Sequence, residues 1–337
     1  MDTPEQAALR EAVRDFCGKH AGPGAHAWAR LAGELGLTGL AVPERYGGAG
    51  AGLAEVAVAV EETGRVLFPA PYLSTALAGA VLADTEASGF LPGIASGALR
   101  AAFVFSDSVE AAGGRLTGAA HHVLDGAEAD LFVVRAGDAL FAVRATDAAV
   151  TPVGTLDQTR SQATVEFRAS PAVGAGGRVG SGVGGRVNSA AERAEELFRV
   201  MLAVESAGAA AHCLDVTVAY LKTRVQFGRP VGAFQALRHR CADLAVEVAS
   251  ARSTAYAAVR AAAGSAAELP VLGPLAKRHC ADVFWHVAAE MIQLHGGIGF
   301  TWEHEAHRYL KRAKTSQLLH GTPAELRRLV SQRAGLC

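Results

Sequence analysis

Three groups of residues in this sequence have types and spacings that suggest chemistry. The first is His304, Glu305 and His307, which bring two imidazoles and a carboxylate together. A zinc-binding helix of the HExxH type spaces its histidines four residues apart, so that both lie on one face. Here the spacing is three, and the segment fits a solvated helix face better. We therefore predict no metal site.

The second group has the chemistry of an anion site, and it comes from two segments, TRVQFGRPVGAFQALRHRC (223–241) and QLHGGIGF (293–300). Adjacent glycines after a helix expose backbone N–H groups that can hold a phosphate, and an arginine can pair with the same anion through two hydrogen bonds. The residues concerned are Arg224, Gly296 and Gly297.

The third group centres on a single histidine at a turn. His320 stands in SQLLHGTPAELRRLV (316–330), where Gly321 and Thr322 form the corner and Pro323 opens a helix. An imidazole has an ordinary pKa of about 6.5, which suits it to proton transfer near neutral pH. His320 is therefore a candidate catalytic base.

A fourth pattern is rejected. Gly180, Gly182 and Gly185 formally match the GxGxxG loop of dinucleotide-binding proteins. No strand ending in an acidic residue follows at the distance that such a unit needs. We interpret residues 171–188 as a glycine-rich linker.

The elements that must position these groups fall into three regions. Residues 1–98 predict a helical domain, which opens on a capping arrangement of Thr3, Pro4 and Gln6 and continues with a helix over 51–68. Residues 99–170 predict a small antiparallel β domain. Its short β-branched and aromatic runs lie at 101–106, 130–136, 139–145 and 162–168.

Residues 189–337 predict a helical bundle. A proline-free stretch from 191 to 224 corresponds to a helix of roughly 50 Å. Further helices are expected from Phe234 onward, at 270–294 and at 301–316, before the one that Pro323 opens. The predicted fold class is α+β, mainly α, with a C-terminal four-helix bundle.

Composition limits the class of protein. The chain has 337 residues, of which 50% are hydrophobic and 19% charged, and its net charge is -1. This balance argues against nucleic acid or an anionic membrane as a partner. Five scattered cysteines without CxxC spacing indicate reduced thiols and a cytoplasmic protein. Neither a signal peptide nor a membrane-spanning run is expected.

Taken together, the motifs resemble the acyl-CoA dehydrogenase family of flavoproteins. LGLTGLAVPERYGGAG, RVQFGRPVGAFQALRHRCADLA, QLHGGIGFTWEHEAHRYLKRAK and HGTPAELRR stand in the family's order and at about its spacing. The resemblance implies an N-terminal helical domain, a small middle β domain and a C-terminal four-helix bundle. It also implies the cofactor FAD, lying across a subunit interface with its ADP half held partly by the neighbouring chain.

The resemblance assigns cofactor-binding roles residue by residue. The matching positions are Arg224, Phe227, Gln235, Gln293, Gly296, Gly297 and Thr322. Family members oxidise an acyl thioester between Cα and Cβ, and electron-transferring flavoprotein is the implied electron acceptor.

The catalytic base of the family is missing. A carboxylate removes the α proton in family members, and in most of them it is the Glu directly before Gly-Thr, which is His320 here. A minority place it where this chain has Phe198, with Glu195 and Glu196 close by. The middle domain is also short, and the family's segments around the flavin ring are not found in it.

Three hypotheses follow. The leading one is a subunit of a heteromeric acyl-CoA dehydrogenase, which supplies the ADP half-site to a base-bearing paralogue. The second is a self-sufficient homo-oligomer that uses His320 as its base, with Glu196 in reserve. The third is a flavin-free relative with a binding, scaffold or non-redox role. The acyl group, and whether CoA or a carrier protein bears it, has no signature in the sequence.

Overall fold

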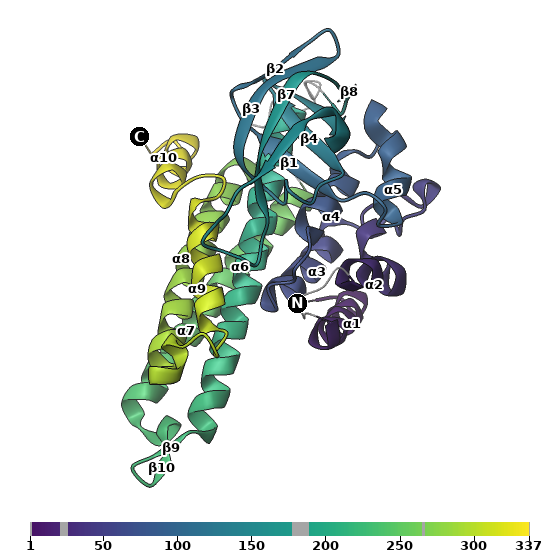
Figure 1. The fold of residues 1–337 in the computed structure, drawn as a ribbon. Coiled ribbons are helices and arrows are strands. Elements are labelled where there is room, and N and C mark those ends of the chain that lie inside the picture. Colours follow the sequence, from purple (N-terminus) through teal and green to yellow (C-terminus); the bar gives the residue numbers. More distant parts are fainter. Residues whose placement is uncertain (1, 21–25, 177–188, 265–266, 337) are drawn as a thin grey trace.

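The computed structural model describes residues 2–20, 26–176, 189–264 and 267–336. The N-terminal helices and the β domain lie together beside one end of a long helical bundle, whose other end projects away from both (Figure 1). The predicted fold class is confirmed. Because residues 177–188 lie outside the described residues, most of the predicted linker, including the GxGxxG match, has no structural account.

The N-terminal domain consists of short helices around one apolar core. Its opening is the predicted cap: the Gln6 backbone N–H donates to Thr3 Oγ1 at 3.2 Å, and the Thr3 N–H donates to Gln6 Oε1 at 3.1 Å. Val13 and Phe16 of the first helix are buried. The helices are α1 (Pro4–His20), α2 (His26–Leu35), α3 (Leu53–Arg65), α4 (Tyr72–Val81) and α5 (Leu91–Ala95), with 3-10 turns η1 (Leu37–Gly39), η2 (Glu44–Tyr46) and η3 (Glu86–Phe90).

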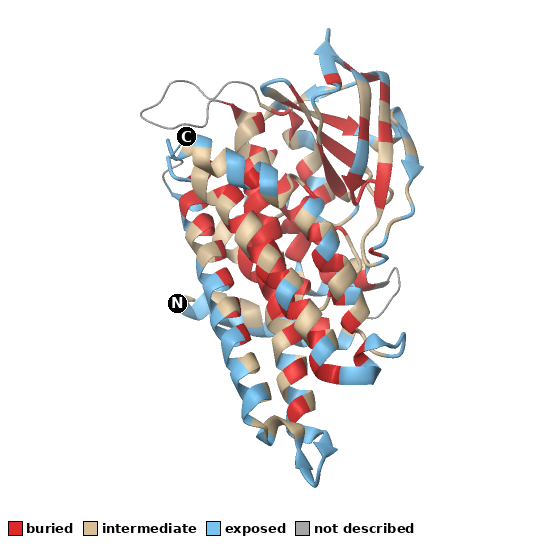
Figure 2. Ribbon diagram, turned by 90° about the vertical axis from the view of Figure 1, so that its left-hand side faces the viewer, coloured by how far each residue is buried: buried red, intermediate tan, exposed pale blue. Residues whose placement is uncertain are grey.

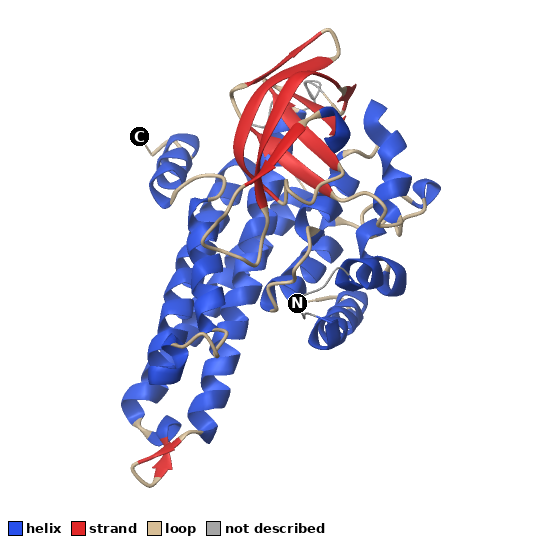
Figure 3. Ribbon diagram, viewed as in Figure 1, coloured by secondary structure: helices blue, strands red, loops and turns tan. Residues whose placement is uncertain are grey.

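The β domain is two four-stranded sheets packed face to face (Figure 3). One sheet has the order β1-β4-β5-β8 and the other β2-β3-β7-β6. The strands are β1 (Ala101–Phe105), β2 (Val109–Ala112), β3 (Arg115–Leu124), β4 (Leu131–Ala136), β5 (Ala139–Arg144), β6 (Ala149–Pro152), β7 (Gln162–Pro171) and β8 (Val173–Gly174), with the 3-10 turn η4 (Ala145–Asp147) between β5 and β6.

Two expectations for this region are wrong. The domain is not wholly antiparallel, because β1 and β4 pair in parallel. The chain leaves β1, builds β2 and β3 in the other sheet, and returns to β4 in the same direction. The linker also begins later than predicted, since β8 pairs with β5. Strand β3, which carries His121 and His122, was not predicted, because its sequence lacks a regular alternation of apolar and polar residues.

The C-terminal bundle is built on α6, whose middle is buried on all sides (Figure 2). The four long helices of the bundle are α6 (Ala190–Thr223), α7 (Gln235–Ala263), α8 (Leu269–His295) and α9 (Ala306–Leu318). A short hairpin, β9 (Val225–Gln226) and β10 (Arg229–Pro230), closes the far end. It is followed by the 3-10 turn η5 (Val231–Ala233), and η6 (Gly296–Phe300) follows α8. Helix α10 (Pro323–Arg333) lies across the other end, near the β domain.

A close helix crossing joins the N-terminal domain to the bundle. At Gly208 of α6, an added Cβ would lie 2.1 Å from the backbone oxygen of Glu61 in α3. At Gly64 of α3, it would lie 2.6 Å from the backbone oxygen of Glu205 in α6. The two glycines therefore allow α3 and α6 to touch through their backbones, which positions the first domain on the bundle.

Among the described helices, α6 alone is long and apolar enough to cross a membrane by length and composition. However, 78% of its most apolar window is buried inside the protein. Its apolar character is accounted for by its place at the centre of the bundle.

Candidate functional site

His320 lies in the turn between α9 and α10, at the end of the bundle that faces the β domain. Its φ is 52°, so a bulky residue holds the left-handed conformation that glycine usually supplies. A cavity of about 690 Å³ opens beside it. Its walls come from the β domain and from the C-terminal helices, and include Phe105, Asp107, His121, His122, Glu195, Arg199, His320 and Glu325.

The surroundings of His320 make it a weak base. Its ring centroid lies 4.6 Å from that of Phe198 and 5.4 Å from that of Phe105, both in edge-on contacts. Desolvation, together with the nearby cations Arg199 and Lys277, lowers the pKa of His320 to about 3. The imidazole is therefore neutral at physiological pH, and it is a weak base.

Two cations bind the turn through its backbone carbonyls. Arg199 Nε donates to the His320 oxygen at 3.3 Å. Lys277 Nζ donates to the Gly321 oxygen at 2.6 Å and to the Gln317 oxygen at 3.1 Å. Lys277 is only 1% exposed, and burial lowers its pKa to about 7. These contacts fix the strained turn from outside it.

The carboxylates of α6 are engaged in ion pairs. Glu196 is buried and accepts from Arg199 at 2.5 Å and from Arg333 at 2.6 Å. Glu195 lines the cavity beside His320, where it pairs with Arg199 and with Arg135, the latter at 2.9 Å. Two arginines therefore neutralise Glu196. Glu195, one residue earlier on α6, has its carboxylate in the cavity instead.

The remaining two acidic groups of this cavity are also occupied. Asp107 is 3.2 Å from Arg135 and almost fully exposed. Glu325 accepts from the Thr322 backbone N–H at 2.8 Å and from its hydroxyl at 2.9 Å. These bonds form a capping box at the start of α10, the helix that the Thr-Pro corner predicted. Thr322 therefore uses its hydroxyl to cap a helix, and its role toward a cofactor stays a prediction.

The other predicted cofactor residues lie at the far end of the bundle. A cavity of about 330 Å³ there brings together Arg224, Gln293, Gly296 and Gly297. Phe227 is 89% exposed at the tip of the β9–β10 hairpin, with a φ of 54°. Gln235 opens α7 at the same end, but it is not a wall of this cavity.

This second site has the chemistry of a phosphate or pyrophosphate site. Arg224 is exposed and makes no ion pair with any described residue, so its charge is available. Nothing lies within 4 Å of a Cβ added at Gly296 or Gly297, so a ligand can approach the backbone there. His295, a wall of the same cavity, has a buried Nε2 without a hydrogen-bond partner in the described structure. The residues therefore fit the ADP half of FAD.

The two sites lie at opposite ends of the bundle. Arg199 adjoins His320, and Arg224 directly follows α6; the 25 residue steps from one to the other span about 40 Å at 1.5 Å each. Figure 1 shows the hairpin and α10 at the two ends. One cofactor molecule lying in the cavity beside His320 cannot reach Arg224 of the same chain.

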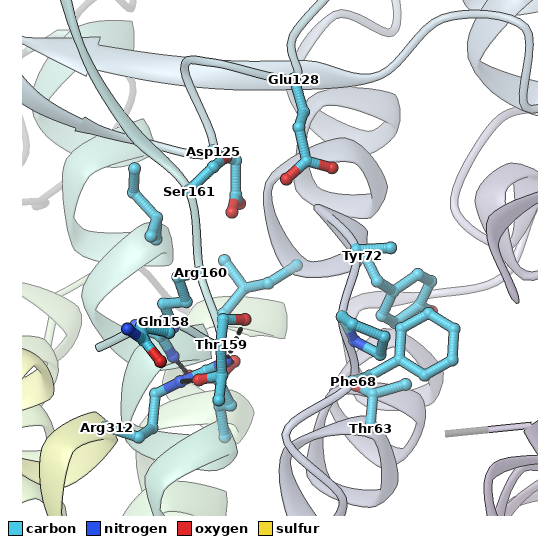
Figure 4. Close-up of a pocket in the computed structure, with 15 residues that line it drawn as sticks. Thr63, Phe68, Tyr72, Asp125, Glu128, Gln158, Thr159, Arg160, Ser161 and Arg312 are labelled. Carbon is cyan, nitrogen blue, oxygen red and sulfur yellow. Dashed lines mark hydrogen bonds and ion pairs between the residues drawn. The ribbon is translucent and has the colours of Figure 1, made fainter. Parts of the chain in front are cut away.

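A third cavity, of about 240 Å³, lies between the N-terminal helices, the β domain and the bundle (Figure 4). The loop before β7 forms one wall. Arg312 of α9 binds this loop, donating to Thr159 Oγ1 at 2.8 Å and lying 3.0 Å from Asp157. No sequence motif indicated this cavity, because its walls come from elements far apart along the chain.

The histidine-rich motif on the approach to α9 does not gather into a site. Glu305 lies 3.2 Å from His212, and the His304 ring accepts from the Ala306 backbone N–H. His307 packs against Trp302, with ring centroids 4.7 Å apart. The three side chains thus make separate contacts.

Comparison with known proteins agrees with this architecture. The family model for the acyl-CoA dehydrogenase N-terminal domain matches residues 3–98, and the model for the C-terminal domain matches residues 189–335. The acyl-CoA dehydrogenase IpdE2 of Mycolicibacterium smegmatis is 36% identical over 342 residues, which cover 97% of this chain and 98% of that protein. The acyl-CoA dehydrogenase FadE34 of Mycobacterium tuberculosis is 36% identical over 335 residues, covering 96% of this chain and 45% of that protein.

Solved structures show the same fold. A variant of the Tcur3481–Tcur3483 steroid ACAD superposes with a TM-score of 0.87 and 28% identity, covering 98% of both chains. The ChsE4–ChsE5 complex from Mycobacterium tuberculosis gives a TM-score of 0.87 and 25% identity, covering 100% of this chain and 99% of that one. This chain therefore belongs to the acyl-CoA dehydrogenase family.

Proposed function

We propose that this chain is one subunit of a heteromeric, FAD-dependent acyl-CoA dehydrogenase that introduces a double bond between Cα and Cβ of an acyl thioester. Its role is to hold the ADP half of a cofactor whose flavin lies in a paralogous partner chain. The observation that carries this proposal is the contrast between the two ends of the bundle. Within the part of the chain that the structure describes, one end keeps an arginine without an ion pair and open glycines, and the other has no free carboxylate next to His320.

Each residue of the far site has a task in this scheme. Arg224 neutralises the charge of the pyrophosphate, and Gly296 and Gly297 let it approach backbone N–H groups. Gln235 and Gln293 provide hydrogen bonds, and the exposed ring of Phe227 is covered by the partner chain. FAD, when bound, supplies the acceptor for the hydride that leaves Cβ.

The environment of His320 favours a base supplied by the partner. Efficient general bases have a pKa near the working pH, and desolvation holds that of His320 far below it. The position where a minority of the family keep their carboxylate holds Phe198, whose side chain packs on His320. A self-sufficient enzyme based on His320 is accordingly the weaker candidate.

Two of the similar structures support the proposal that this chain pairs with a paralogue. The ChsE4–ChsE5 and Tcur3481–Tcur3483 structures each carry the names of two proteins, and both match over nearly their full length. We extend this arrangement to the present chain, with an acyl-CoA or an acyl carrier thioester as substrate. Electron-transferring flavoprotein is proposed as the acceptor of the electrons.

The test is co-expression with a neighbouring acyl-CoA dehydrogenase paralogue that carries the glutamate. The isolated chain should hold little flavin, whereas the purified complex should hold one FAD per pair of unlike chains and turn over an acyl-CoA. His320→Ala in this chain should leave that turnover unchanged, and removal of the paralogue's glutamate should abolish it. An isolated chain that binds FAD stoichiometrically, and whose turnover His320→Ala abolishes, would refute the proposal.

A further inference from the structure

His295 is the last residue of α8, and its side chain has no task in the proposed function. It is a wall of the cavity of about 330 Å³ that also contains Arg224, Gly296 and Gly297. The residue is only 3% exposed, and its Nε2 atom has no hydrogen-bond partner in the described structure. A buried polar atom without a partner is costly, so this atom favours a ligand that provides one.

The surroundings of the ring make Nε2 an acceptor. The other ring nitrogen, Nδ1, lies 2.7 Å from the backbone oxygen of Met291, one turn earlier in α8. Because a carbonyl oxygen can only accept, Nδ1 carries the proton of the neutral ring and Nε2 carries a lone pair. Burial, together with the neighbouring His304, lowers the pKa of His295, so the ring is neutral at physiological pH. Nε2 therefore needs a donor, which an ionised phosphate oxygen cannot supply.

Aromatic neighbours hold the His295 ring in one orientation. The ring stacks on Tyr220, with centroids 4.4 Å apart and an interplanar angle of 27°, and it packs against His304 with centroids 4.3 Å apart. The Tyr220 hydroxyl also donates to the His295 backbone oxygen at 3.3 Å. Together with the bond to Met291, these contacts make Nε2 an acceptor of fixed position, as a binding site requires.

The walls of this cavity are of two kinds, which match the two parts of a nucleotide. Arg224 and the open glycines suit the pyrophosphate. The apolar walls are formed by Val231, Leu237 and Leu294. The volume equals that of roughly eleven water molecules in the liquid, which is room for one purine base. A nucleoside also carries hydrogen-bond donors, on the base and on the sugar.

We propose that His295 recognises the nucleoside of the bound nucleotide through Nε2, which accepts a hydrogen bond from the adenine amino group or from a ribose hydroxyl. This inference rests on the proposed function, because it takes the nucleotide to be the ADP half of FAD. Arg224 provides affinity for the pyrophosphate, which every nucleoside diphosphate shares. His295 provides selectivity, since only a nucleoside with a donor in the right place pairs with its buried acceptor. His295 is thus a specificity-determining residue of the half-site.

The direct test titrates the purified full-length chain with ADP and three analogues by ligand-observed NMR. Purine riboside diphosphate lacks the amino group, whereas 2′-deoxy-ADP and 3′-deoxy-ADP each lack one ribose hydroxyl. The analogue without the donor that meets Nε2 should bind about tenfold more weakly than ADP, because it leaves a buried acceptor unpaired. The analogue that loses affinity thereby identifies the donor. Equal binding of ADP and all three analogues would overturn the proposal.

Variants of His295 locate the effect. His295→Phe keeps a ring against Tyr220 but removes the acceptor, so ADP should bind about tenfold more weakly and no better than the analogue that lost affinity. His295→Gln places an amide oxygen near the position of Nε2 and should restore part of the preference for ADP. A merely structural role of the ring would instead weaken ADP and all analogues alike. The control is His286→Phe on the same helix, which should keep the preference of the wild type: His286 lies 2.8 Å from Glu247 and is not a wall of the cavity.

Inorganic pyrophosphate separates a failure of this inference from a failure of the proposed function. If pyrophosphate and every nucleotide bind, and Arg224→Ala weakens them all, but ADP is not preferred, the anion site stands and the role of His295 is refuted. If neither pyrophosphate nor ADP binds, the half-site itself is refuted and His295 has no nucleotide to recognise. A preference for ADP that persists in His295→Phe would also refute the proposal.

Discussion

The ring of His320 packs edge-on against the ring of Phe198, with centroids 4.6 Å apart and an interplanar angle of 63°. These two positions are the ones at which acyl-CoA dehydrogenases carry their carboxylate base, according to the resemblance of the sequence. The structure brings them into contact although they are far apart along the chain. An aromatic pair thus occupies the place of both alternative bases.

The first prediction concerns the protonation of His320. Because desolvation and two neighbouring cations lower its pKa to about 3, the ring should stay neutral between pH 5 and 8. Its side-chain resonances, followed by NMR on protein with labelled histidine, should not shift over this range. His286, which is half exposed and 2.8 Å from Glu247, provides a solvent-accessible histidine for comparison in the same spectra. A midpoint near 6.5 for His320 would restore it as a candidate base.

The second prediction concerns Arg224 and FAD. In the complex with the catalytic partner, Arg224→Ala should weaken FAD binding about 10- to 100-fold, because it removes a charged hydrogen-bond donor to the pyrophosphate. Fluorescence titration of the flavin-free complex measures this affinity. Arg229→Ala is the control, since its guanidinium lies on the same hairpin but over the Phe234 ring, 4.1 Å from the centroid. Equal losses in both variants would indicate a general effect of charge instead of a site.

The third prediction concerns Lys277 and pH. Burial lowers its pKa from an unfolded value near 10.5 to about 7. Between these two values the unfolded chain binds more protons than the folded one, so the free energy of unfolding should rise with pH through this window. The variant Lys277→Met removes this pH-dependent contribution to stability. It also takes the hydrogen-bond donor away from two backbone carbonyls, so the variant should be about 1–3 kcal/mol less stable than the wild type at pH 7.

Urea unfolding of both proteins between pH 7 and 10 tests this point. The stability of the wild type should increase relative to Lys277→Met as the pH rises. A difference between the two proteins that stays constant over this range would mean that Lys277 titrates at its ordinary pKa.

The fourth prediction concerns the crossing of α3 and α6. Gly208→Ala places a Cβ 2.1 Å from the Glu61 oxygen, so the helices must separate, at a cost of about 1–3 kcal/mol in the free energy of unfolding. The matched control is Gly33→Ala in α2, where nothing lies within 4 Å and the better helix propensity should add about 0.5–1 kcal/mol. Thermal unfolding should therefore move in opposite directions in the two variants. A Gly208→Ala protein as stable as the wild type would show that α3 and α6 can move apart at little cost in free energy.

Several features of this protein were predictable from the sequence, because they depend on residues close together along the chain. The cap at Thr3 follows from a side chain three residues away and forms as predicted, and the helix that Pro323 opens is present. The helices 190–223 and 269–295 follow from long runs of helix formers, within one residue of the expected bounds. The family motifs are likewise local, so the fold class could be read from them. The start of α9 at Ala306 was less predictable, since the turns before it use the same polar residues as a helix.

Tertiary structure decided what depends on distant residues. The parallel pairing of β1 with β4 is set by the chain's excursion through the other sheet, which no local pattern encodes. The low basicity of His320 arises from burial against Phe198 and from the charges of Arg199 and Lys277, which lie on two other helices. The separation of Arg224 from His320 follows from the length of α6, while the cavity beside Arg160 exists only because helices and strands from all three regions meet there. Sequence determines local conformation through neighbouring side chains, whereas acidity, cavities and the distance between sites depend on which segments pack together.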